Sequence, residues 1–394
     1  MRHLSVVICV LLCLSNAFAK SKSRRELPTD FPLPASFDID SQLADARRAH
    51  LATPKITDPE IVTTGNSVFG DLVGTTMITG YGLPYHWQLS VLDDGITNAG
   101  SLPDGEIVVD GGMAKLLKSD RGLWAAVLSH EVAHTARRHA VRMYLYQEYV
   151  RDLLTYYRMR AAAGDKNANW AILGVSISAP IAERKLSRDL EHDADIAGMM
   201  LMARAGYHPD NVFALHHLLK AQTGEQSKFA AFFSTHPRWE TRDQRDEKAY
   251  SDALAEYERL WPDASKSPGG LPPSVAFLTK PTARENKKNK TADIRVPIYC
   301  RNTIAPVDVV LRFSRNAQPI PTTDTTFRDT KGDLVVQQEF QCGDRDEGRP
   351  FSVAISAGAV SDRDRKMKAR MVVFDANGGL LALGDEFDVH IPKR

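Results

Sequence analysis

The sequence predicts an α+β fold in two parts: a mainly helical domain with a small β-sheet, and then a separate all-β, sandwich-like domain. Three observations support this division. Residues 38–262 alternate helical periodicity with a few short strand-like runs. Residues 263–293 are rich in Pro, Gly and Ser and then in Lys, which is typical of a linker. From residue 294 onward, short β-rich segments alternate with turn residues, as in a β-sandwich or barrel.

The N-terminus predicts an export signal. A short basic start precedes the apolar run LSVVICVLLCL, and Ala17, Phe18 and Ala19 supply the small residues of a cleavage site. The run is too short to cross a bilayer comfortably. We therefore expect a signal peptide over residues 1–19 and an N-terminal extension over residues 20–37. The chain would then be exported, either to the periplasm of a bacterial envelope or as a secreted protein.

Charge and cysteine content limit the function classes. The formal net charge is +1, and loss of the signal would remove Arg2 and no acidic residue, so the charge is balanced. A balanced chain lacks the basic character of nucleic-acid-binding domains, and we expect no nucleic-acid partner. Cys300 and Cys342 are the two cysteines beyond the signal. In an exported chain they predict one disulfide.

Two strands and a long helix are expected in the helical domain. Residues 86–94 (HWQLSVLDD) and 105–112 (GEIVVDGG) are short, β-rich and closed by turn residues. Residues 123–163 contain neither Gly nor Pro, which predicts one long helix. Residues 170–182 (WAILGVSISAPIA) are the best candidate for a membrane span. They are too short and contain Pro180, so we expect a buried or hairpin element and no transmembrane segment.

The all-β domain is predicted from short segments that are separated by turn signals. These are residues 294–302, 307–314, 334–342, 351–358, 369–379 and 386–393. Cys300 and Cys342 fall within two of the segments, so their disulfide would staple two strands. The domain could bind partners, orient substrates or stabilise the fold, and the sequence leaves these roles open.

Residues 127–141 (VLSHEVAHTARRHAV) contain His130, Glu131 and His134 in the pattern H-E-x-x-H. On a helix, positions i and i+4 share a face, so both imidazoles can reach one ion. The intervening glutamate can then take a proton from water beside the metal. The alternative is a polar helix that is rich in histidine by chance. His139 lies about 140° further around a continuous helix than His134, so we expect a polar or packing role for it.

An acidic segment offers the third protein ligand that a catalytic zinc ion needs. In residues 187–198 (SRDLEHDADIAG), Glu191 and Asp195 stand four positions apart and share a helix face. Glu191 could ligate while Asp195 orients a ligating imidazole from behind. A solvated acidic helix face is the alternative for the whole segment. The competing ligand candidates are Asp189, His192 and Asp193, of which His192 should point away from Glu191.

Three segments in this order, SHEVAHTARRH, SRDLEHDADIAGMMLMARAGYHP and STHPRWETR, resemble the HtpX-like and CAAX prenyl endopeptidase family of zinc metallopeptidases. The similarity spans roughly residues 55–245. It implies a gluzincin core that binds one zinc ion per chain. It also implies these roles: zinc ligands His130, His134 and Glu191, catalytic base Glu131, and supporting carboxylate Asp195.

The third of these segments carries two further candidates. His236 matches a late histidine of the family that stabilises the transition state, and its alternative is a loop histidine held by Pro237. Arg242 matches a basic residue that follows this histidine in relatives. It could pair with an active-site carboxylate, and its alternative is a surface ion pair.

Residues 98–105 (NAGSLPDG) resemble the family segment that leads into the strand on which an extended substrate is laid. The resemblance implies that residues 105–112 are an exposed edge strand, with an ordinary half-buried strand as the alternative. Gly100 and Ser101 stand where relatives carry bulkier apolar residues, which alters the groove. Backbone pairing at an edge reads conformation rather than sequence. The implied substrate-binding residues are Asn98, Gly105, Ile107 and Val109.

These features together predict a zinc-dependent endopeptidase that hydrolyses internal peptide bonds of unfolded or damaged envelope proteins, as in protein quality control. Its partners would be unfolded or extended polypeptides, and peripheral association with the envelope is left open. Two alternatives remain. One is a chaperone-like or scaffold protein that holds extended chains, with proteolysis minor or masked. The other is a zymogen-like protease whose groove is covered.

Overall fold

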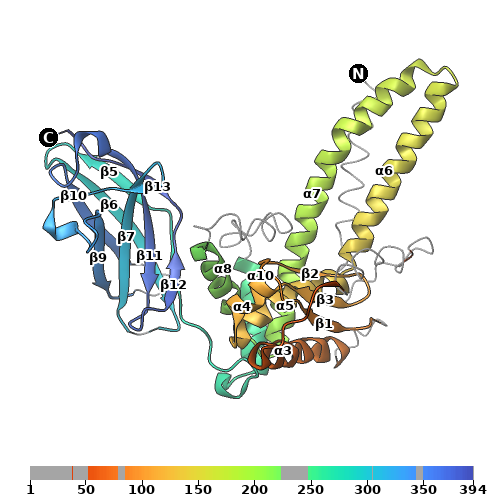
Figure 1. Cartoon of the computed structure of the whole chain (residues 1–394), viewed down its shortest axis with the longest axis horizontal. Coiled ribbons are helices and arrows are strands. Elements are labelled where there is room, and N and C mark those ends of the chain that lie inside the picture. Colours follow the sequence, from red (N-terminus) through yellow and green to blue (C-terminus); the bar gives the residue numbers. More distant parts are fainter. Residues whose placement is uncertain are drawn as a thin grey trace. The chain divides into compact units, whose positions relative to one another are not determined.

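The computed structural model of the chain describes residues 38, 52–78, 85–222, 247–303, 305–342 and 349–393. They divide into two compact units (Figure 1). The first contains the described residues up to Val212 and those from 247 to Leu271, and the second contains residues 213–222 and the described residues from Pro272 onward. The first is mainly helical and the second is all strand apart from short helices, as the α+β prediction requires. The predicted signal peptide and N-terminal extension lie outside the described residues.

Helices dominate the first unit. Its helices are α3 (Pro59–Ile78), α4 (Gly111–Leu117), α5 (Arg121–Ala136), α6 (His139–Ala162), α7 (Lys166–Arg204) and α10 (Glu247–Leu260), while α8 (Asp210–Gln222) spans the boundary between the units. An aspartate caps the start of α5, because the side chain of Asp120 accepts a hydrogen bond from the backbone N–H of Leu123. α5 lies in the core of this unit, since Trp124, Leu128 and Val132 are fully buried.

The single helix predicted over residues 123–163 is in fact two helices, so this prediction is wrong. α5 ends at Ala136 and α6 begins at His139, because Arg138 adopts left-handed backbone angles of φ 54° and ψ 42°. A left-handed residue that is neither Gly nor Asn is uncommon. Composition therefore gave no sign of the break.

α6 and α7 form an antiparallel helical hairpin (Figure 1). Its arms pack through a buried cluster that includes Val175 and Leu186, and the hydroxyl of Tyr146 donates to the carbonyl of Ala179 over 2.9 Å. Residues 170–182 lie in the α7 arm, which is the hairpin element expected from the sequence. Within the described part of the chain, we find no helix that is both long and apolar enough to cross a membrane.

A three-stranded sheet packs against α5. Its strands are β1 (Gln88–Val91), β2 (Ala99–Ser101) and β3 (Glu106–Val109). β3 is the central strand, parallel to β1 and antiparallel to β2. The prediction that residues 105–112 form an edge strand is therefore wrong. The edges are β1 and the short β2. The sequence did not predict β2, because Gly100 and Ser101 have little β propensity.

The second unit contains two β-sheets. One has the order β10-β6-β4, with β5 also paired to β6, and the other has the order β12-β11-β7-β8, with β13 on β11 and β9 on β7. The strands are β4 (Val275–Leu278), β5 (Thr282–Asn286), β6 (Thr291–Arg301), β7 (Val307–Arg315), β8 (Gln318–Pro319), β9 (Val335–Phe340), β10 (Arg349–Ser356), β11 (Lys366–Phe374), β12 (Leu380–Leu383) and β13 (Phe387–His390). β4 and β5 fall within residues 263–293, so antiparallel pairing with β6 replaces part of the expected linker.

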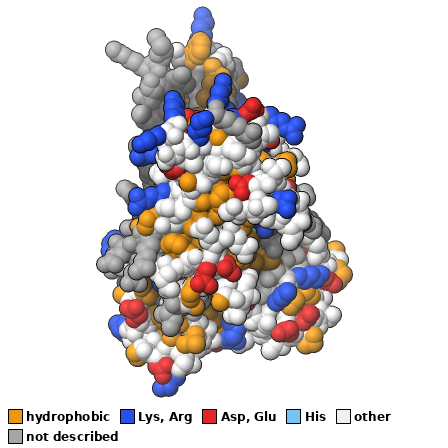
Figure 2. Space-filling view, turned by 90° about the vertical axis from the view of Figure 1, so that its left-hand side faces the viewer, with side chains coloured by type: hydrophobic (Ala, Val, Ile, Leu, Met, Phe, Trp, Pro, Cys, Tyr) orange, Lys and Arg blue, Asp and Glu red, His pale blue; other side chains and the backbone are white. Residues whose placement is uncertain are grey.

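Side chains from both sheets meet in one buried cluster. Val296 of β6 and Phe351 of β10 come from one sheet, and Leu311 of β7 and Met371 of β11 come from the other. This is the sandwich-like packing that alternating strands predict for the region. On the face shown in Figure 2, basic and acidic side chains are interspersed, in keeping with the net charge of +1.

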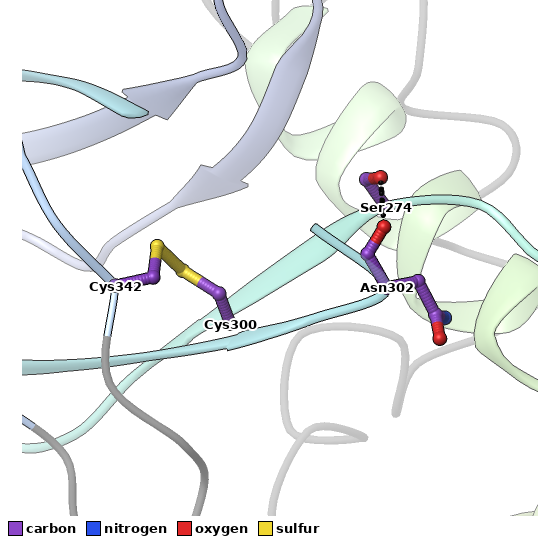
Figure 3. Close-up of a disulfide and its surroundings, with 4 residues drawn as sticks. All are labelled: Ser274, Cys300, Asn302 and Cys342. Atoms are coloured by element: carbon purple, nitrogen blue, oxygen red, sulfur yellow. Dashed lines mark hydrogen bonds between the residues drawn. A yellow bond between two sulfur atoms is a disulfide. The ribbon is translucent and has the colours of Figure 1, made fainter. Parts of the chain in front are cut away.

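The predicted disulfide between Cys300 and Cys342 is present, with the two Cα atoms 5.6 Å apart (Figure 3). Cys300 lies near the end of β6, and Cys342 follows β9, so the bond links a strand of one sheet to the segment that follows a strand of the other. The two residues are 42 positions apart in the sequence. Closing a loop of this length in the unfolded chain stabilises the fold by about 4 kcal/mol on the chain-entropy estimate.

Candidate metal centre and active site

Helices α5 and α7 bring three candidate ligands together. His130 and His134 lie one turn apart on α5, and Glu191 reaches them from α7. The Nε2 atoms of the two imidazoles are 3.0 Å apart. Oε1 of Glu191 lies 3.3 Å from Nε2 of His134, and Oε2 lies 3.6 Å from Nε2 of His130. One ligand atom from each residue can therefore contact the same ion.

This triangle fits a zinc-type site. Tetrahedral ligands at zinc distances of about 2.1 Å lie about 3.4 Å from one another, close to the spacing of 3.0 to 3.6 Å found here. Two imidazole nitrogens and a carboxylate oxygen also match the ligand set of catalytic zinc sites that keep a fourth position open. The side chains of His130 and Glu191 are 7% and 6% exposed, so a cation would offset the cost of burying the carboxylate.

Asp195 supports His130 from behind. Its Oδ1 lies 3.0 Å from Nδ1 of His130, whereas Nε2 of the same ring faces Glu191. A carboxylate beside Nδ1 favours a proton on that nitrogen, which leaves the lone pair of Nε2 free for a metal. Asp189, one competing ligand candidate, instead pairs with Lys185 over 2.7 Å. His192, the second competitor, does not belong to the three-residue ligand group.

A second set of contacts supports His134, and the sequence did not predict it. Nδ1 of His139 lies 3.0 Å from Nδ1 of His134, and Nε2 of His139 lies 3.2 Å from Oδ2 of Asp193. Burial lowers the pKa of His139 to about 3, although its hydrogen bond with Asp193 acts in the opposite direction. The expectation of a remote packing role assumed a continuous helix, and the break at Arg138 is what turns His139 toward His134.

Asp193, the third competing ligand candidate, is held by two buried arginines. Nη2 of Arg137 lies 3.1 Å from Oδ1, and Nη1 of Arg142 lies 3.6 Å from Oδ2. Burial opposes a charged carboxyl, but the hydrogen bond from His139 and the two guanidinium groups hold the pKa of Asp193 below its usual value. Asp193 therefore contacts His139 and is not one of the three candidate metal ligands.

The sequence pattern of peptidase family M48 matches residues 73–247. Residues 73–247 belong to peptidase family M48. This M48 segment contains the whole His130, His134 and Glu191 group. It also agrees with the extent of the similarity, roughly residues 55–245, that the sequence resemblance suggested.

Relatives of the M48 segment include three proteins named mitochondrial metalloendopeptidase OMA1. The chain is 31% identical to the Schizosaccharomyces pombe protein over 184 residues, which is 45% of this chain and 52% of that protein. Identity is 29% to the Arabidopsis thaliana protein (40% of this chain, 30% of that one) and 26% to the Saccharomyces cerevisiae protein (44% and 50%). The chain thus matches about half the length, or less, of these relatives.

These relatives correct the expected location. All three are mitochondrial by name, which contradicts the prediction of a periplasmic or secreted protein. N-terminal targeting segments for different destinations share basic and apolar or small residues, so a short basic and apolar start is weak evidence for one compartment.

A solved structure, Pseudomonas fluorescens alkylpurine DNA glycosylase AlkC bound to DNA containing an abasic site analog, covers 71% of this chain and 87% of its own. Its TM-score of 0.17 and identity of 12% carry no argument.

A glycine allows the two ligand-bearing helices of the M48 segment to approach each other. Gly198 lies seven residues after Glu191 on α7, on the face turned toward α5. A Cβ atom at this position would lie 2.9 Å from the backbone oxygen of Ser129 and 3.0 Å from the backbone nitrogen of His130. Neither backbone atom can move away without displacing α5. The close packing at Gly198 therefore sets the distance between the α5 ligands and Glu191.

We expect Gly198→Ala to reduce the free energy of unfolding by about 1–3 kcal/mol, because the added methyl group overpacks the contact between the helices. Gly74→Ala in α3 is the matched control, since a Cβ there would meet nothing within 4 Å. The control should leave stability unchanged or raise it by about 0.5–1 kcal/mol. Urea denaturation of both variants measures the difference, and equal stability of the two would disprove the close contact.

The group of His130, His134 and Glu191 opens onto a cavity of about 220 Å³. Its wall includes His134 and Glu191 together with Ser101 of β2 and the following Leu102. The hydroxyl of Thr135, next to His134 on α5, donates to the carbonyl of Leu102 over 3.0 Å. This bond fixes the end of the edge strand beside the metal group. The apolar residues of the wall are Leu102, Pro103, Ala140, Val141, Met143 and Leu190.

The four substrate-binding candidates do not lie together at a free strand edge. Ile107 and Val109 of β3 have no exposed surface, and the backbone of β3 is paired on both sides. Gly105 precedes β3, and its N–H donates to the carbonyl of Leu102 within the turn. The carbonyl of Asn98 accepts from the N–H of Asp110. His236 and Arg242 lie outside the described residues.

Proposed function

We propose that the chain is a zinc-dependent endopeptidase that hydrolyses internal peptide bonds of unfolded or locally extended polypeptides. The observation that carries this proposal is the buried group of His130, His134 and Glu191, which borders a cavity beside the end of an edge strand. Membership of residues 73–247 in peptidase family M48 supports the same chemistry.

The ligands and Glu131 have separate roles in the proposed reaction. A zinc ion bound by His130, His134 and Glu191 would polarise the scissile carbonyl and acidify a water molecule. Glu131 follows His130 directly on α5 and is 2% exposed, so its carboxylate is shielded from bulk water. It takes a proton from the attacking water and delivers that proton to the nitrogen of the departing amine.

Strand β2 suits an extended substrate. Among the described residues, it pairs with β3 on one side and with no strand on the other. A substrate segment added to β2 would be held by main-chain hydrogen bonds, which select extended conformation rather than a particular sequence. Folded proteins seldom offer such a segment, so unfolded or damaged chains are the fitting substrates. The apolar wall of the cavity favours an apolar substrate side chain next to the cleaved bond.

The deciding experiment measures metal content and casein cleavage on the purified chain. We expect about one zinc ion per chain and cleavage of casein at internal bonds. A chelator should remove both the zinc and the activity, and stoichiometric Zn²⁺ should restore them. A stably folded protein such as native lysozyme serves as the substrate control and should not be cut.

Two outcomes would change the proposal. A folded chain that binds no zinc would refute the metalloendopeptidase assignment of the whole protein. Zinc binding without cleavage of casein would favour the alternative function, in which the chain holds extended polypeptides and proteolysis is minor or masked.

A further inference from the structure

We propose that Asp193 and His139 act as a positioning pair that keeps the proton of His134 on Nδ1 and so directs the lone pair of Nε2 toward the metal. This inference rests on the proposed metal site and adds two residues to it. Neither Asp193 nor His139 belongs to the three-ligand group. Both therefore act on the metal site through His134. Asp195 contacts the ring of His130 directly. Asp193 acts on the ring of His134 through the intervening His139.

The contacts form a continuous chain from a buried carboxylate to the ligand group. Oδ2 of Asp193 lies 3.2 Å from Nε2 of His139, Nδ1 of His139 lies 3.0 Å from Nδ1 of His134, and Nε2 of His134 lies 3.3 Å from Oε1 of Glu191. Asp193 and His139 are 5% and 4% exposed. Water therefore cannot easily substitute for either partner.

With a neutral His139, one arrangement of protons satisfies the two links from Asp193 through His139 to His134. The carboxylate of Asp193 accepts hydrogen bonds and donates none, so Nε2 of His139 must carry its proton. In a neutral ring, Nδ1 of His139 is then an acceptor, and it must receive the proton of Nδ1 of His134. The remaining nitrogen of His134, Nε2, is left without a proton, which is the form that a metal ligand requires.

The backbone at the end of α5 makes this relay possible. On a continuous helix, His139 would lie about 140° around the axis from His134. The left-handed residue Arg138 ends the helix and turns the chain, so that the two rings meet edge to face with centroids 4.8 Å apart. An uncommon conformation at a residue with a long side chain is retained where the surrounding structure requires it.

A pair of substitutions at position 139 separates positioning from simple packing. His139→Gln keeps both roles, because its amide oxygen can accept from Nδ1 of His134 and its NH2 group can donate to Asp193. His139→Leu has a similar volume and keeps neither role. Competition with a chromophoric chelator measures the Kd for Zn²⁺. We expect Leu to weaken binding by about 10- to 100-fold, as loss of an outer hydrogen-bond partner does elsewhere, and Gln to stay within about threefold of wild type.

The proton positions can be measured without metal or activity. In the metal-free chain, long-range ¹H–¹⁵N spectra of labelled histidine should show the proton of His134 on Nδ1 in wild type and in His139→Gln. In Asp193→Asn, Arg137 holds the amide oxygen and the NH2 group faces His139. Both rings should then reverse, with the proton of His134 moved to Nε2.

Each result supports or overturns the positioning role. Equal zinc affinity of the Leu and Gln variants, with both chains folded by circular dichroism, would overturn it. So would a wild-type spectrum with the His134 proton on Nε2. If the wild-type chain binds no zinc but shows the expected proton positions, the proposed function fails while the hydrogen-bond relay stands. If Asp193→Asn does not fold, the variants at position 139 and the wild-type spectrum still decide the question.

Discussion

Glu131→Gln is expected to slow casein cleavage by about 10²–10⁴-fold, because glutamine has the same shape as glutamate but cannot take a proton from water. Glu131 is not one of the three residues in the ligand group, so the variant should still bind one zinc ion with an affinity within about threefold of wild type. The measurement compares initial cleavage rates and zinc content on the same preparations. Loss of activity with zinc retained assigns Glu131 to the reaction and not to the metal site.

Glu183→Gln is the matched control for this substitution. Glu183 is a carboxylate on α7 that accepts a hydrogen bond from the side chain of Gln147 at the surface, eight residues before Glu191. Its replacement should leave both cleavage and zinc content at the wild-type level. A Glu131→Gln variant that cleaves casein as fast as this control would show that another group acts as the base.

The sequence predicted the three residues that converge in the site and a supporting role for Asp195, but not the contacts of His134 with His139 and of His139 with Asp193. The spacing of His130 and His134 on a helix fixes their common face whatever the rest of the fold does. The choice of Glu191 as third ligand depended on resemblance, because the residues alone left Asp189, His192 and Asp193 as competing candidates. Packing of α7 against α5 separates them, since each neighbouring side chain points to a different partner, as Asp193 does to Arg137 and Asp189 to Lys185.

The errors in the fold have local physical causes. Helix propensity is high on both sides of Arg138, and the left-handed residue that breaks the helix is set by tertiary contacts that propensity cannot show. β3 was expected at the edge of the sheet from the family resemblance, and the strand that covers it, β2, is only three residues long and has little β propensity. β4 is the apolar run VAFL, which was included in the linker because Pro, Gly and Ser precede it. β5 is the polar run TAREN, whose strand conformation depends on pairing with β6.

Glu191→Gln is expected to weaken zinc binding by more than about 100-fold, because it removes a charged ligand rather than an outer hydrogen-bond partner. The effect can be followed by thermal unfolding with and without Zn²⁺. A metal ion that binds only the folded chain, at a free concentration of 100 times its Kd, stabilises the fold by about 2.7 kcal/mol. Wild type should therefore melt at a higher temperature when Zn²⁺ is added, while Glu191→Gln should show no such shift.

Asp189→Asn tests whether this loss belongs to Glu191 or to the acidic segment as a whole. Asp189 lies two residues earlier on α7 and pairs with Lys185 over 2.7 Å, so its replacement should leave the zinc-dependent shift intact. An equal loss in both variants would mean that the segment binds cations as a diffuse acidic surface. Loss of the zinc-dependent shift in Glu191→Gln alone would show that Glu191 is a specific ligand. The two acids lie on the same helix, and packing gives them different partners.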